Sequence, residues 1–232
     1  MIRPLSLLAL LCFAAAPAAA LPRTFTVTSF DRIRVEAPFA VTLATGRSSF
    51  ARADGPAAAL DAIDLRVEGR TLILRQRRSS GGPVLAGPVR ISLGTPNLHS
   101  ASVVGSGSLS IQRLTGLSVD VALGGAGSLT VEEVAADRLV ASVQGSGALT
   151  LGGRVKTASL TARGTPSLLA EALRAEEVTI VAEGTAEVAA SARTLARVTA
   201  AGTVGVRLSG APACELKVSG SATVEGCAAR RR

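Results

Sequence analysis

Aromatic residues are nearly missing from this sequence. It has no Trp and no Tyr, and the last of its five Phe residues is Phe50. Sugar-binding platforms and grooves for single-stranded nucleic acid usually stack their ligands on aromatic faces. From residue 51 onward the chain has no such faces, which argues against both kinds of ligand there and against nucleic acid as a partner.

Residues that carry catalysis or bind metals are also scarce. The only His is His99, and the repeat region described below contains only two Asp residues, Asp120 and Asp137. Two acidic pairs, Glu132-Glu133 and Glu176-Glu177, fall in expected turns. A polysaccharide-acting β-helix enzyme, which stays a remote alternative, needs acids or a base gathered on one face. The sequence therefore predicts no catalytic residue, no metal site and no cofactor.

Long apolar runs are missing except at the N-terminus. A short basic start precedes an apolar run from Leu5 to Ala16, and Ala18-Ala19-Ala20 resembles an A-x-A cleavage site. This order is typical of a secretory signal peptide, and the run is shorter than the roughly 20 residues that span a bilayer. We expect residues 1–20 to be a signal peptide cleaved after Ala20. The mature protein is then periplasmic or on the cell surface, without a transmembrane segment.

Cysteine usage supports two interpretations. Cys12 lies within the signal segment, where Leu11 takes the place of the small residue that a lipobox requires. Removal of the segment leaves only Cys214 and Cys227, and an oxidising compartment favours their pairing. We therefore predict a disulfide that closes the last coil of the chain, with free thiols as the alternative.

The basic residues are almost all Arg, since Lys156 and Lys217 are the only lysines, and the formal net charge is +8. Arg and Ala richness is what a GC-rich genome produces, but a basic surface also attracts anionic glycans and lipid head groups. The Arg-rich tail can equally be a solvated chain end. The candidate contacts with a polyanion are Arg75, Arg77, Arg78, Arg230, Arg231 and Arg232.

Internal repetition is the strongest signal. Glycine-led triplets such as Gly105-Ser106-Gly107 recur every 18 to 20 residues, which marks a solenoid in which each repeat forms one coil. A sharp corner between strands needs backbone angles that Gly adopts at little cost. The predicted corners are Gly105, Gly125, Gly145, Gly164, Gly184, Gly202 and Gly220.

Apolar and polar residues alternate with period two on both sides of each corner. In the second coil, Val119, Val121 and Leu123 precede the corner, and Leu129 and Val131 follow it. Such alternation indicates strands with one face turned inward. Each coil is therefore expected to run strand, glycine corner, strand and return turn. Stacking would place Arg163 between Gln144 and Glu183 on the outer face, with an ion pair to Glu183.

The N-terminal third is β-rich but does not repeat. We expect strands at Ile33–Glu36, Phe39–Thr45, Leu65–Val67, Thr71–Arg75 and Val89–Leu93. Residues 56–62 have a Pro-led pattern that permits a short helix. Because the first coil of a solenoid needs cover, this Phe-bearing segment is the expected cap. The predicted organisation is a signal peptide (1–20), a β-rich segment (21–97), a Gly-repeat β-solenoid (98–227) and a basic tail (228–232).

With these residues in view, the chain resembles the head GIN domain family of adhesin-like envelope proteins. The resemblance covers about residues 25–226 and rests on Phe30–Val35, Phe39–Leu43, Leu72–Leu74, Val89–Leu93 and the Gly105-Ser106-Gly107 signature. It implies an exported, all-β, right-handed parallel β-helix-like solenoid, here with about seven coils of 18–20 residues.

Two function classes remain open. The first is a non-enzymatic structural or adhesive module of the cell envelope that binds an envelope protein or surface polymer. The second is a binder of anionic glycan or lipopolysaccharide through the Arg clusters. The sequence does not identify the partner or the oligomeric state.

Overall fold

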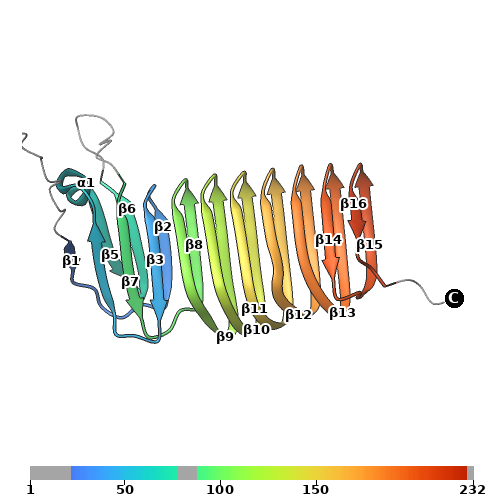
Figure 1. Ribbon diagram of the computed structural model, residues 1–232, viewed down its shortest axis with the longest axis horizontal. Helices are drawn as coiled ribbons and strands as arrows, with labels where there is room; N and C mark the ends of the chain where they lie inside the picture. Colours follow the sequence, from blue (N-terminus) through green and yellow to red (C-terminus); the bar gives the residue numbers. More distant parts are fainter. Residues whose placement is uncertain (1–21, 78–87, 229–232) are drawn as a thin grey trace, which may run out of the picture.

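The computed structural model describes residues 22–77 and 88–228 (Figure 1). Strands make up 74% of the described residues and helix 3%, and the parallel coils form a β-solenoid of about six turns. The predicted all-β solenoid is therefore confirmed. Its last corner, Gly220, is followed only by a three-residue strand, so the final coil is incomplete. No helix in the described part of the chain is long and apolar enough to cross a membrane.

The described elements, in chain order, are β1 (Arg23–Phe25), β2 (Arg32–Glu36), β3 (Ala40–Thr45), β4 (Phe50–Asp54), α1 (Ala57–Asp61), β5 (Ile63–Glu68), β6 (Thr71–Gln76), β7 (Arg90–Thr95), β8 (Ser100–Gly105), β9 (Ser108–Gly125), β10 (Ser128–Gly145), β11 (Ala148–Gly164), β12 (Ser167–Gly184), β13 (Glu187–Gly202), β14 (Gly205–Ser209), β15 (Ala213–Gly220) and β16 (Thr223–Glu225). The five strands and the short helix expected in the N-terminal third are all present, each shifted by a few residues at most.

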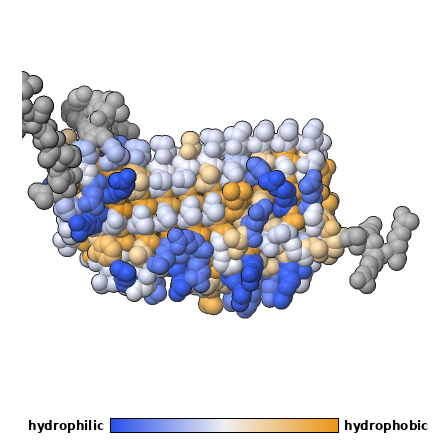
Figure 2. Space-filling view, viewed as in Figure 1, coloured by the Kyte–Doolittle hydropathy of each residue, from blue (hydrophilic) through white to orange (hydrophobic). Residues whose placement is uncertain are grey.

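Successive coils pair in parallel with the corner glycines in register, so that the corners form one edge of the molecule (Figure 1). Gly145 shows why a glycine is required there. Its φ is +112°, which residues with side chains rarely adopt. A Cβ built on Gly145 would also lie 2.5 Å from the carbonyl oxygen of Gly125 in the coil below. Figure 2 shows rows of similar hydropathy along the long axis, as expected when equivalent residues stack.

The return segments differ from the turns that we expected, because they continue the ladder. In β10, Glu133, Val134 and Ala135 pair with residues of β9, and Val134 is fully buried. The return segment thus adds a third inward column, which also contains the buried Leu114 and Leu173. Pairing keeps the backbone groups of this segment hydrogen-bonded, which a coil stacked on both sides requires.

Strands β2 and β3 form an inner layer of the solenoid, out of sequence order. Strand β2 pairs in parallel with β6 on one side and β8 on the other, and β3 lies in the same way between β7 and β9. Ile33 is therefore stacked between Leu72 and Ala101. The residues expected to form only a cap thus contribute two parallel layers to the solenoid.

The cap itself is antiparallel. Strand β4 pairs antiparallel with β7, β1 with β4, and β5 with β6, and α1 lies at the same end (Figure 1). Reversal of strand direction ends the parallel stack and covers its first layer. Phe50 of β4 lies against Gly94 of β7, where an added Cβ would meet the Phe50 ring at 2.2 Å.

Candidate functional site

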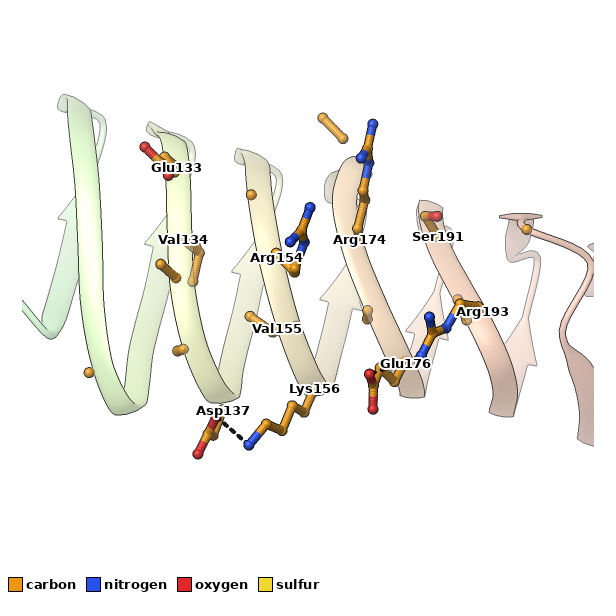
Figure 3. Close-up of a pocket in the computed structure, with 18 of the residues that line it drawn as sticks. Glu133, Val134, Asp137, Arg154, Val155, Lys156, Arg174, Glu176, Ser191 and Arg193 are labelled. Atoms are coloured by element: carbon orange, nitrogen blue, oxygen red, sulfur yellow. Dashed lines mark hydrogen bonds and ion pairs between the residues drawn. The ribbon is translucent and has the colours of Figure 1, made fainter.

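A groove of about 1310 Å³ lies along the return side of the solenoid (Figure 3). Its walls come from the return segments of β10 to β13, and the buried Val134 and Val155 lie beneath it. Several of the residues that border it have small side chains, which leaves the surface hollow at this point. They are Ala135, Ala136, Gly153, Ala172, Ala175 and Ala192.

Arg154 and Arg174 lie in this groove at positions that pair directly between β11 and β12. Both side chains are exposed, and Figure 3 shows both pointing toward the same side of the groove. Neighbouring strands in a sheet lie roughly 4.8 Å apart. The two Arg side chains therefore start from neighbouring backbone positions on the ladder.

The other charged residues of the groove have partners. Lys156 Nζ lies 2.8 Å from Asp137 Oδ1, Arg193 lies 3.0 Å from Glu176, and Glu133 binds an Arg of β9. The hydrogen bond with Asp137 raises the pKa of Lys156. Arg154 and Arg174, by contrast, form no ion pair with any residue that the structure describes.

Like charges placed opposite each other on neighbouring strands destabilise a sheet. An anion placed between Arg154 and Arg174 would reverse that effect. Guanidinium groups donate forked hydrogen bonds that match carboxylate, phosphate and sulfate oxygens. The arrangement is therefore suited to binding an anionic group, and the neighbouring Leu117, 82% exposed, adds apolar surface at the groove.

Sequence reasoning missed this pair because the repeat length changes at that point. Arg154 follows its corner, Gly145, by nine residues, whereas Arg174 follows Gly164 by ten. When the repeats are aligned on their corner glycines, the two residues therefore fall at different repeat positions, one residue apart. A register shift between Thr150 and Gly153 corrects the offset in the structure. The shorter 19-residue coil was the only signal, and its effect on register could not be located from the sequence.

The predicted Arg cluster lies elsewhere. Arg75 is on β6, at the opposite end of the solenoid from β13 (Figure 1), with its Nε 2.6 Å from Glu36 Oε2. Arg34 also bonds to Glu36. The Arg75 hydrogen bond is the main cause that holds the pKa of Glu36 below its usual value, with Arg34 contributing, and in return it raises the pKa of Arg75. Arg77 is exposed directly after β6. The remaining predicted contacts, Arg78, Arg230, Arg231 and Arg232, lie outside the described residues.

Two predicted contacts are confirmed. Gln144, Arg163 and Glu183 occupy paired positions on β10, β11 and β12, and Arg163 Nε lies 3.1 Å from Glu183 Oε2. Cys214 and Cys227 form a disulfide with their Cα atoms 5.8 Å apart.

The acids and the single His that were considered for catalysis are dispersed. His99 accepts a 3.4 Å hydrogen bond from Arg32. Glu176 and Glu177 contact Arg193 and Arg197, respectively. Within residues 22–77 and 88–228, no three His, Cys, Asp or Glu side chains gather as a metal site would require.

The fold places the chain among the parallel β-solenoids. Residues 29–212 match the model of the family described as "Putative auto-transporter adhesin, head GIN domain", and the chain belongs to this family. The resemblance inferred from the sequence is thus confirmed. No curated protein matches the chain.

Solved structures share the fold at low sequence identity. An adhesin-like protein of Bacteroides fragilis is 20% identical, with a TM-score of 0.78 over 90% of this chain and 96% of its own. A protein of Parabacteroides distasonis whose printed name is "Putative lipid binding protein" is 17% identical, with a TM-score of 0.70 over 89% and 96% of the two chains. An adhesin-like protein of Parabacteroides merdae is 18% identical, with a TM-score of 0.68 over 90% and 96%.

Proposed function

We propose that this chain is an exported, non-enzymatic binding module of the cell envelope, with an adhesive or structural role, and that its return-side groove holds an anionic envelope polymer. The observation that carries the proposal is the stacked pair Arg154 and Arg174, which lacks an acidic partner among the described residues. A repeating polymer suits a site built on a repeat, because several anionic groups can lie along one groove.

The second observation in favour is the contrast with the Arg75 cluster. Arg75 is already paired with Glu36, and an added anion would have to compete with that carboxylate. Arg154 and Arg174 have no carboxylate partner among the residues that the structure describes. The groove is therefore the better candidate for a polyanion site, and the Arg230–Arg232 tail is the second candidate.

Binding to lipopolysaccharide and to a sulfated glycan, heparin, tests the proposal. We expect Arg154→Gln and Arg174→Gln each to weaken binding of one of these probes about tenfold, as loss of a charge-assisted hydrogen-bonding group does. Raising the salt concentration should weaken wild-type binding, because exposed charges are screened.

A matched control is Arg138→Gln, since Arg138 is an exposed Arg on β10 that does not border the groove. It removes the same charge and should leave affinity nearly unchanged. Equal losses for Arg138 and Arg154 would mean that net charge alone attracts the probe. A loss confined to a variant with Arg230, Arg231 and Arg232 changed to Gln would assign binding to the tail instead.

A further inference from the structure

The C-terminal end of the solenoid leaves core residues in contact with solvent. Leu216 and Val218 of β15 stack on Val198 and Ala200 of β13. They are 47% and 45% exposed, whereas Val198 and Ala200 are each 1% exposed. Among the described strands β15 pairs only with β13, so its other edge has no partner in the described part of the chain. The cap of β1, β4, β5 and α1 covers only the opposite end (Figure 1).

The strand register shows which residues of β15 direct their backbone N–H and C=O groups to the unpaired edge. Asp120, five residues before its corner glycine, donates its N–H back to the preceding coil, and Glu215 holds the same position in the last coil. Successive residues of a strand direct their N–H and C=O groups to opposite edges. The backbone groups of Cys214, Leu216 and Val218 therefore point to the unpaired edge.

The outward side chains of β15 are self-complementary in charge. Glu215 and Lys217 flank Leu216. Glu215 lies 3.0 Å from Arg197 of β13, which leaves its second carboxylate oxygen able to accept from another cation. Lys217 forms no ion pair with a described residue. If a second β15 pairs antiparallel with Leu216 opposite Leu216, each Glu215 faces the Lys217 of the second copy. Moving the register by two residues in either direction would put Glu215 opposite Glu215, or Lys217 opposite Lys217. Like charges in those positions are unfavourable, so the register centred on Leu216 is favoured over its two nearest alternatives.

We propose that this end of the solenoid is the docking surface for a second copy of the same chain, with the β15 strands antiparallel about a two-fold axis at Leu216. The pairing satisfies the unpaired edge, covers Leu216 and Val218, and continues one sheet through both copies. It also closes the assembly, because a two-fold contact uses the same surface on each copy. Exposed strand edges that are neither paired nor covered invite association.

Charge reversal at low ionic strength tests the register. Glu215→Lys and Lys217→Glu each place like charges opposite each other, and each should raise the dimer dissociation constant about tenfold in sedimentation equilibrium. An equimolar mixture of the two variants should restore dimers, since Lys at 215 then faces Glu at 217. Glu171→Lys, at an exposed position on β12, changes charge equally and should have no effect.

Three results would overturn the proposal: a wild-type protein that is monomeric at its highest soluble concentration, a dimer that both single variants leave intact, or a mixture that fails to recover dimers. Circular dichroism and a non-reducing mass measurement of the Cys214–Cys227 bond establish that each variant is folded. Recovery in the mixture would itself exclude misfolding as the cause of the single-variant losses.

Discussion

Cys214 and Cys227 lie at the two ends of the last coil, and their disulfide joins β15 to the segment that follows β16. No described coil stacks above this one, so the covalent bond replaces the support that every earlier coil receives from both sides. We expect Cys214→Ser to destabilise the last coil by about 3 kcal/mol, the loop-closure value for a short loop.

Hydrogen exchange measures that effect locally, and faster exchange should be confined to residues 205–228. Reduction of the disulfide in the wild-type protein is the control. It should produce the same local increase in exchange as the variant. Uniform loss of protection along the whole solenoid would contradict a local role for the bond.

Gly145→Ala should destabilise the protein by at least about 2 kcal/mol, because it adds a strained backbone angle to a backbone clash. The added Cβ would meet the Gly125 carbonyl at 2.5 Å. Gly124→Ala is the matched control, since a Cβ at Gly124 has no atom within 4 Å, and it should change stability by less than about 0.5 kcal/mol. Urea denaturation compares the two, and equal effects would show that the corner does not require glycine.

Glu36 gives a pH-dependent contribution to stability. Its pKa is lowered in the folded state, chiefly by the hydrogen bond from Arg75. A carboxyl group with a depressed folded pKa stabilises the protein above its unfolded pKa, near 4.5, and that contribution is lost as the pH falls through the folded pKa. Glu36→Gln should therefore lower stability by up to about 1 kcal/mol at pH 7 and by progressively less in acid.

Urea denaturation of the Glu36→Gln variant at pH 7 and pH 3 measures this dependence. Glu132→Gln is the control, because Glu132 is exposed and forms no ion pair among the described residues. A Glu36 effect that is the same at both pH values would show that the ion pair is not its source.

Export should produce a mature chain that begins at Leu21, because the A-x-A site ends at Ala20. N-terminal sequencing and intact mass of protein from the native envelope would measure this. Retention of Met1, or a lipid on Cys12, would contradict it. Ala18→Arg is a useful variant, since a large charged side chain at the cleavage site should block processing and leave the longer form.

The contacts that the sequence predicted lie one repeat apart. Arg163 and Glu183 are separated by 20 residues, one full coil, and the corner glycines align through the same spacing. In a solenoid each coil contacts only its neighbours, so register follows from period. The disulfide was predicted on different grounds, because removal of the signal segment leaves only Cys214 and Cys227 and an oxidising compartment favours their pairing.

The place of the N-terminal strands was decided only in the tertiary structure. Arg32 of β2 pairs with both Thr71 and Ser100, so that β2 and β3 lie between layers formed by later parts of the chain. The alternation in Ile33–Glu36 predicts a strand but contains no information about which strand it joins. Pairings between strands far apart in the sequence depend on which strand edges the rest of the chain leaves unpaired.

The sequence by itself determined the all-β class, the coil length, the glycine corners and the Arg163–Glu183 ion pair, because each of these is encoded within one period. Only the tertiary structure decided that Arg154 and Arg174 are neighbours and that Leu216 is exposed at an open end. The first depends on a register shift that offsets coils of unequal length. The second depends on which strand edges remain unpaired after all the others have paired. A local sequence pattern does not contain that information.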